Sequence, residues 1–264
     1  MKYVSIIILL LSSFFLTAQT VIPAPETVVQ GNGEFRTKNL QADIRQTTNT
    51  ALPSEAYRLQ VTENGIEIEA SGDAGFFYAR QTLKQLASDQ NGTWIIPCLK
   101  IEDRPRVGFR SFLLDSGRQY QKVSTIKKYI DMAALLKMNY FHWHLTEGLG
   151  WRIEIKQYPR LTEVGAFVGK GPDQQGFYSQ EEIKEIVRYA AERGITVIPE
   201  IDMPGHAEAA LVAYPELGCF GDTIQVPENG FTQNIFCSGK THTLDFLKIV
   251  AVFQTVFFDT LPAI

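Results

Sequence analysis

The sequence predicts an α/β fold, the N-terminal part of a (β/α)8 TIM barrel with about its first three βα units, preceded by a small α+β domain. Strand and helix patterns alternate after Arg104. Each predicted strand in that part ends in polar side chains, and parallel α/β sheets carry their sites at the carboxyl ends of strands. No glycine-rich phosphate loop follows these strands, which disfavours a doubly wound dinucleotide-binding sheet.

Length and composition narrow the range of functions. The 264 residues, 45% of them hydrophobic, suffice for one large or two modest domains with a buried core. Lysine plus arginine (25) against aspartate plus glutamate (29) gives a net charge of −4, without a basic block. Because nucleic-acid binding needs a positive footprint, we expect no nucleic-acid partner.

Residues 1–20 are predicted to be a signal peptide, separate from the fold. Lys2 supplies the positive end, Ile6–Leu16 the apolar run, and Leu16-Thr17-Ala18 a small-residue cleavage site. This run is too short to span a membrane stably. We therefore expect an exported protein, periplasmic or extracellular, with no membrane span after signal removal. The alternative is a buried N-terminal strand.

Three cysteines follow. Cys219 and Cys237 lie in a loop-rich region, and an oxidising compartment permits a disulfide between them. Two unpaired thiols remain the alternative, because a sequence does not give their separation. Cys98 is left over, and the spacing of the cysteines is no metal signature.

From 21 to 104 the patterns predict a small α+β domain without catalytic groups. Alternating apolar residues at Tyr57–Val61 and Ile66–Ile68 flank Asn64-Gly65, which predicts a hairpin. Trp94–Leu99 is a further predicted strand. The helix between them is indicated by apolar residues at helical spacing, namely Phe76, Ala79, Leu83 and Leu86.

After the charged joint Glu102–Pro105, an incomplete barrel domain is predicted over 105–264, with an atypical tail from about 249. Its first strand is Phe109–Asp115, and Ser124 is expected to cap the helix that follows.

Two more strands and a second helix continue this alternation. Tyr140–Leu145 is the second strand, and a loop of about thirty residues follows it, long enough to be a candidate for function. Ser179 and Glu182 form a capping box for the next helix, and Ile195–Ile201 is the third strand. Polar side chains at the carboxyl ends of the three strands are Asp115, Arg118, His144, Glu147, Glu200, Asp202 and His206.

Three motifs, in this order, resemble glycoside hydrolase family 20, the β-N-acetylhexosaminidases. They are Arg110–Arg118, His142–Thr146 with Gly150–Ile155, and Pro199–His206. The likeness runs from about residue 25 to 247 and includes the small α+β domain that precedes the barrel in that family. The resemblance implies a glycoside hydrolase that removes terminal, non-reducing N-acetylglucosamine or N-acetylgalactosamine from oligosaccharides or glycoconjugates, without a metal or cofactor.

The resemblance also implies roles for residues. Arg110 matches the arginine that binds the hydroxyls at carbons 3 and 4 of the terminal sugar. Glu147 and His206 match a carboxylate and histidine that support the acid/base residue, although the family more often has two aspartates where this chain has Glu147-Gly148. Further candidates for substrate contact are Glu200, Asp202 and Trp151. The alternatives are hydrogen bonds between strand ends for the two carboxylates and a core position for the indole.

Family 20 works by substrate assistance, in which the substrate's acetamido oxygen attacks carbon 1. An adjacent Asp-Glu pair, in a His-x-Gly-Gly-Asp-Glu motif at the end of strand four, orients the acetamide and protonates the leaving oxygen. The sequence lacks this motif; strand four is expected after Phe246, where an apolar, β-branched run follows instead. We therefore expect an inactive fragment, truncated before the motif and not stably folded alone. The alternative is a genuine short protein with a divergent tail.

Two other functions stay open. A metal-dependent barrel hydrolase is one, because a His-x-His pair on a strand can hold a metal. Its ligands would come from His142, His144, Glu200, Asp202 and His206. The other is a non-catalytic sugar-binding or vestigial fragment.

Overall fold

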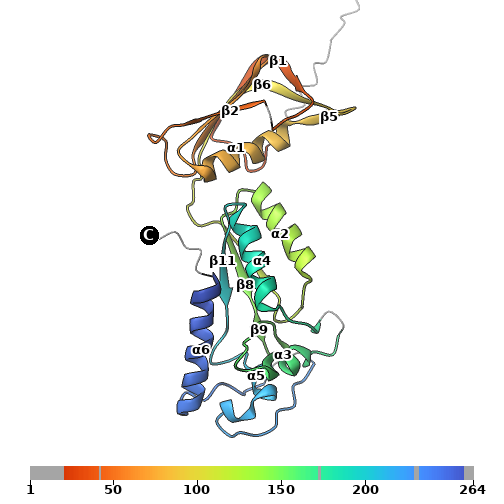
Figure 1. Cartoon of the computed structure of the whole chain (residues 1–264), viewed down its shortest axis with the longest axis vertical. Helices are drawn as coiled ribbons and strands as arrows, with labels where there is room; N and C mark the ends of the chain where they lie inside the picture. The colour runs from red at the N-terminus through yellow and green to blue at the C-terminus, as the bar shows by residue number, and fades with distance from the viewer. Residues whose placement is uncertain (1–20, 42, 172–173, 229–231, 259–264) are drawn as a thin grey trace, which may run out of the picture.

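The computed structural model describes residues 21–41, 43–171, 174–228 and 232–258, which form two units packed end to end (Figure 1). Each unit has its own core of buried apolar side chains. The signal peptide predicted at 1–20 lies outside the described residues.

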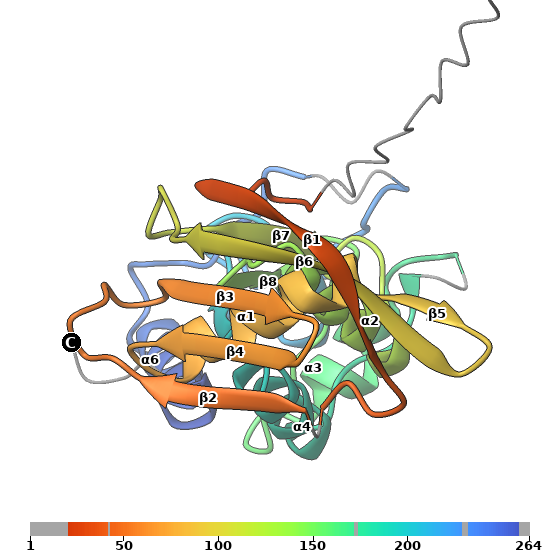
Figure 2. The same cartoon turned by 90° about the horizontal axis from the view of Figure 1, so that it is seen from above.

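A β-sheet with one helix on one of its faces makes up the first unit (Figure 2). Its elements are β1 (Thr27–Thr37), β2 (Ile44–Thr48), β3 (Tyr57–Thr62), β4 (Gly65–Ala70), α1 (Asp73–Leu86), β5 (Ser88–Gln90) and β6 (Thr93–Asp103). The strands run in the order β1-β6-β3-β4-β2, and β5 pairs with β6. Helix α1 lies between this sheet and the second unit, where it contacts helix α2 (Val123–Leu135) (Figure 1).

The predicted hairpin and helix of this unit are confirmed. Strands β3 and β4 are antiparallel, with Thr62 opposite Gly65. Their inward side chains are all buried, namely Tyr57, Leu59, Val61, Ile66, Ile68 and Ala70. Strands β1 and β2 were not predicted, because most of their residues are exposed and an exposed strand has no alternation of apolar residues.

Three parallel strands with helices on one face form the second unit. The strands are β7 (Ser111–Asp115), β8 (Tyr140–His144) and β11 (Thr196–Glu200), in the order β11-β8-β7. Helices α2 and α4 (Gln180–Ala191) pack on them through Ile126, Ile130, Ile183 and Ile186. The three predicted strands are confirmed to within two residues at each end.

The two predicted helix starts have different outcomes. Ser179 accepts a hydrogen bond from the backbone N–H of Glu182, whose side chain accepts one in return, so the capping box is confirmed. The Ser124 cap was wrong. Helix α2 begins at Val123, and its cap residue Lys122 makes no capping bond through its side chain.

The connection from β8 to α4 contains short ordered elements rather than one open loop. They are β9 (Thr146–Glu147), β10 (Gly150–Trp151), α3 (Arg160–Glu163) and the 3-10 helix η1 (Gly165–Phe167). Strands β9 and β10 pair antiparallel, with Glu147 opposite Gly150. This tight pairing begins two residues after β8, and β9 lies beyond the end of that strand (Figure 1).

After β11 come α5 (Glu208–Ala213), the 3-10 helix η3 (Pro215–Leu217) and α6 (Thr241–Phe258). The apolar run after Phe246, where the family would have its fourth strand, belongs to helix α6 in this chain. Phe246, Val250 and Phe253 recur at helical spacing and are buried in the core of the second unit. Neither α6 nor any other described helix is long and apolar enough to cross a membrane.

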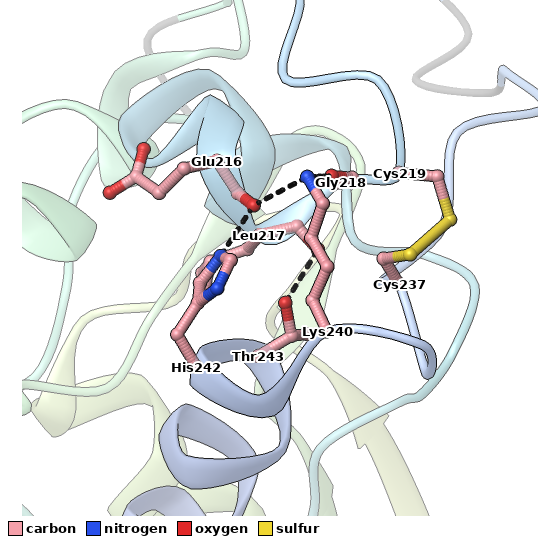
Figure 3. The surroundings of a disulfide bond; sticks show 8 residues. All are labelled: Glu216, Leu217, Gly218, Cys219, Cys237, Lys240, His242 and Thr243. Carbon is pink, nitrogen blue, oxygen red and sulfur yellow. Dashed lines mark hydrogen bonds between the residues drawn. A yellow bond between two sulfur atoms is a disulfide. The ribbon is translucent and has the colours of Figure 1, made fainter.

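A disulfide joins Cys219 and Cys237, whose Cα atoms are 4.7 Å apart (Figure 3). The free Cys98 is buried in the first unit. Beside the disulfide, the start of α6 contacts the carbonyl groups of η3. His242 lies 2.7 Å from the Glu216 carbonyl oxygen, and Thr243 donates to the carbonyl of Leu217.

Replacing Cys237 with serine is expected to lower the free energy of unfolding by about 3 kcal/mol, because the open chain regains the entropy of the 18-residue loop. Urea unfolding of both proteins, with and without dithiothreitol, measures this. Reductant should shift the midpoint of the wild-type chain and leave that of Cys237→Ser unchanged. A wild-type midpoint that is insensitive to reductant would contradict a stabilising disulfide.

Candidate active site

The carboxyl ends of β7, β8 and β11 bring Asp115, His144 and Glu200 into one row, because the strands are parallel and in register. His144 is buried, and its Nδ1 lies 2.9 Å from Glu200 Oε1. The other Glu200 oxygen lies 2.5 Å from His142 Nε2. Glu200 therefore contacts two imidazoles on the face of the sheet away from the helices.

Glu147 lies behind this row, on β9, with its side chain 5% exposed. Its Oε1 is 3.0 Å from His206 Nδ1 and 3.8 Å from His144 Nε2. Its Oε2 accepts the backbone N–H of Gly148 at 2.8 Å. Gly117 leaves the room that this carboxylate needs, because a Cβ there would lie 2.9 Å from the Glu147 Cβ. The structure thus brings together the predicted pair Glu147 and His206.

His206 adopts a left-handed backbone conformation, with φ 49°, which is unusual for a residue other than glycine. Its Nδ1 is also 2.6 Å from Asp202 Oδ2. Asp202 is fixed by its backbone N–H, which donates to Thr146 Oγ1 at 3.0 Å. Two carboxylates, Glu147 and Asp202, therefore face one imidazole nitrogen of His206. A left-handed backbone conformation is costly for histidine, and such a conformation persists where the surrounding contacts fix it.

Arg118 contributes the guanidinium of this cluster, a role that could not be assigned from the sequence alone. It contacts Asp115 Oδ2 at 2.6 Å and also Glu147, and its side chain is 53% exposed. Partial burial opposes its charge, but the hydrogen bond to Asp115 and the charge of Glu147 outweigh it, so the pKa of Arg118 lies above the usual value. The sequence feature that could have identified Arg118 as a candidate is its position three residues after Asp115, the acidic residue at the end of a predicted strand.

Arg110, the predicted sugar-binding arginine, does not lie in the cluster with Glu147 and His206. It precedes β7, whereas Asp115 ends that strand, and five residues of strand span about 16 Å. Its guanidinium donates to Glu55 Oε1 at 2.7 Å and to the Tyr78 hydroxyl at 3.0 Å, both in the first unit. Its Nε donates to the Lys137 carbonyl at 2.7 Å. Arg110 joins the two units instead.

Trp151 lies in the core of the second unit. The residue is 2% exposed, its indole N–H donates to the Ile153 carbonyl at 2.7 Å, and its ring packs 6.0 Å from that of Phe246. This burial agrees with the core position that was the alternative to substrate contact.

Two overlapping sets in the cluster have atoms close enough to hold a metal ion. They are His144, Glu200 and Asp202, and Glu147, Asp202 and His206, with the ligand atoms of each set within 4.8 Å of one another. His142, the other half of the His-x-His pair, is in neither set. Arg118 contacts Oε1 of Glu147, a member of the second set, so a cation already faces that set.

Comparison with known proteins identifies the family of both units. Residues 108–259 match the model of the glycosyl hydrolase family 20 catalytic domain, and residues 36–104 match domain 2 of the same family. A β-hexosaminidase of Porphyromonas gingivalis is 46% identical over 215 residues, which are 76% of this chain and 28% of that protein. A β-N-acetylhexosaminidase of Cellulomonas fimi is 38% identical over 236 residues, 81% of this chain and 47% of that protein.

Solved structures agree with these sequence matches. The β-N-acetylhexosaminidase of Bacteroides fragilis superposes with a TM-score of 0.85 at 52% identity, over 92% of this chain and 55% of that one. The N-acetyl-β-hexosaminidase of Streptomyces plicatus gives 0.82 at 34% identity, over 92% and 57%. The chain thus spans about half or less of each of these relatives. The shared fold is the TIM barrel, of which the second unit forms the first βα units, and the chain belongs to glycoside hydrolase family 20.

Proposed function

We propose that this chain carries part of the sugar-binding site of a β-N-acetylhexosaminidase, specific for terminal, non-reducing N-acetylglucosamine or N-acetylgalactosamine. The observation that carries the proposal is the contact of Glu147 with both His206 and Arg118 at the carboxyl ends of the barrel strands. The relative from Vibrio harveyi, 30% identical, was solved in complex with N-acetylglucosamine. Oligosaccharides or glycoconjugates that end in this sugar are the proposed partners.

Each residue of the cluster takes a distinct part in this proposal. Arg118 replaces Arg110 as the residue that binds paired sugar hydroxyls, because its planar fork of donors suits two adjacent oxygens and its side chain is half exposed. Glu147 and His206 support the acid/base group from behind. Glu200 and Asp202, each about one quarter to one third exposed, are the further sugar-contact candidates.

Hydrolysis needs two more groups under the substrate-assisted, retaining mechanism of this family. These groups are the Asp that orients the acetamide and the Glu that protonates the leaving oxygen. The His-x-Gly-Gly-Asp-Glu motif that would carry them does not occur in the 264-residue sequence. The residues present can therefore bind the sugar and support the acid/base group, but none of them is assigned a bond-breaking step. We expect this chain to bind the sugar without hydrolysing an aryl N-acetyl-β-glucosaminide.

Export and domain organisation complete the proposal. Residues 1–20 would be removed as a signal peptide, 21–104 would be the non-catalytic domain and 105–264 the barrel domain, in a periplasmic or extracellular setting. The Cys219–Cys237 disulfide supports this setting, because such bonds persist in oxidising compartments.

Substituting Arg118 with lysine is expected to weaken the binding of N-acetylglucosamine about ten- to a hundredfold, because a lysine cannot donate two parallel hydrogen bonds from a planar fork. Titration of the chain with the sugar, followed by NMR, measures the dissociation constant. The matched control is Arg110→Lys, the same change at the other end of β7, which should leave sugar binding unchanged. A loss confined to Arg110→Lys would contradict the assignment.

A further inference from the structure

Arg152 is a fully buried arginine whose side-chain hydrogen bonds all run to backbone carbonyl groups. The residue is 0% exposed, and no described carboxylate lies within ion-pair distance of it. Five hydrogen bonds of 2.8 to 3.0 Å run from Nε, Nη1 and Nη2 to the carbonyls of Ser116, Ala166, Gly176, Gly117 and Gln174. All five N–H donors of the guanidinium are thereby satisfied.

These five carbonyls belong to segments that are far apart in the sequence. Ser116 and Gly117 form the turn between the end of β7 and Arg118, whereas the other three carbonyls lie in η1 and the stretch before α4. The backbone of Arg152 adds two bonds, since its N–H donates to the Leu145 carbonyl at 2.9 Å and its carbonyl accepts the N–H of Tyr178 at 2.8 Å. One residue therefore ties the end of β7 to the end of β8 and to the long connection.

The turn that Arg152 holds is the turn that shapes the cluster. The N–H groups of Ser116 and Gly117 donate to the His144 carbonyl at 2.9 and 3.1 Å. Gly117 packs directly against the side chain of Glu147. The next residue, Arg118, donates its backbone N–H to Asp115 Oδ1 at 2.9 Å and contacts Glu147. A shift of the turn would move Arg118 and Glu147 relative to each other.

We propose that Arg152 is a positioning residue that fixes Arg118 against Glu147 by binding the carbonyls of the Ser116-Gly117 turn. The position of Arg118 follows from contacts within the chain. The effect of Arg152 on sugar affinity rests on the function proposed above.

Only an arginine fits this pocket of carbonyls. Burial lowers the pKa of Arg152 to about 10, yet the group stays protonated at neutral pH and keeps all its donors. A lysine has three donors on one atom and cannot reach five separated acceptors. Gly150 provides the space, because a Cβ there would lie 2.0 Å from the guanidinium carbon.

Two variants test the proposal in the full chain. Arg152→Lys keeps the charge and removes the fork, whereas Gly150→Ala keeps Arg152 and displaces its guanidinium. In either variant that folds, the NMR signal of the Arg118 Nε–H group should move from its wild-type position. The dissociation constant for N-acetylglucosamine should rise about tenfold or more, as expected for a misplaced binding group.

The control is Ile186→Val, which loosens the core of the same unit without touching the turn. It should lower the unfolding midpoint while the Arg118 signal and the sugar affinity stay unchanged. The positioning role would be overturned if the Arg118 Nε–H signal of Arg152→Lys stays at its wild-type position and the unfolding midpoint of this variant is no lower than that of Ile186→Val. If the wild-type chain does not bind the sugar, the proposed function fails, and the Arg118 signal alone still decides the proposal.

Discussion

Truncation of Trp143 to alanine is expected to lower the free energy of unfolding of the barrel unit by about 3–5 kcal/mol, the range for a large aromatic side chain lost from a core. Trp143 is 0% exposed on the central strand β8. The centroid of its ring lies 4.7 Å from the ring centroid of Tyr178 and 5.6 Å from that of Phe141. The cavity would open under the strand that carries His144, so sugar binding should weaken as well.

The matched control is Trp143→Phe, which keeps most of the packing and removes the indole N–H that donates to Ser116 Oγ at 2.9 Å. Loss of that hydrogen bond should cost about 1 kcal/mol. Urea unfolding followed by circular dichroism measures both variants. Equal losses for the alanine and phenylalanine variants would show that the hydrogen bond, and not the packing, dominates at this position.

Removal of the Asp103 carboxylate in Asp103→Ala is the second change with a large expected effect, again about 3–5 kcal/mol. Lys137 Nζ lies 2.7 Å from Asp103 Oδ2 and donates to the Tyr57 hydroxyl at 2.9 Å. The Lys137 side chain is 7% exposed. Without Asp103, the ammonium group of Lys137 would stay buried between the two units with no opposing charge. Leaving one charge of a buried pair costs more stability than removing both charges.

The double variant Asp103→Ala with Lys137→Met should therefore be more stable than Asp103→Ala alone, because it removes the buried charge as well. Thermal unfolding of the two single variants and the double variant measures the coupling. A double variant as unstable as the sum of the singles would show that the two groups act independently.

The effect of Asp103→Ala should also depend on pH. Burial lowers the pKa of Lys137 below its usual value, and the hydrogen bond and charge of Asp103 oppose that shift. Without Asp103 the folded-state pKa falls further below the unfolded value of about 10.4, so the unfolded state binds the proton more tightly. Stability of Asp103→Ala should rise with pH as Lys137 loses its proton, and its deficit against the wild-type chain should shrink. A deficit that is constant between pH 7 and about 10 would contradict this.

Elements whose signals are local could be predicted from the amino-acid sequence. The period of two in β3 and β4, the hairpin at Asn64-Gly65 and the Ser179-Glu182 capping box each involve residues a few positions apart, and all are confirmed. The three barrel strands are largely apolar segments that end in polar residues, which placed the site at their carboxyl ends. The three motifs likewise gave the family, because their order and spacing are properties of the chain alone.

Which side chains of the site meet depends on how the two units fold and could not be predicted from the sequence. Arg110 and Arg118 flank the same strand, and the sequence does not say that one reaches Glu55 across the junction of the two units while the other reaches Glu147. The burial of Trp151 against Phe246 and the closing of the Cys219–Cys237 bond depend on packing between segments distant in the chain. The apolar run from Ile249 has β-branched residues, which suit a strand, but its neighbours in the core favour a helix. Contacts over long sequence separations follow from the assembled core, and local propensity carries no information about them.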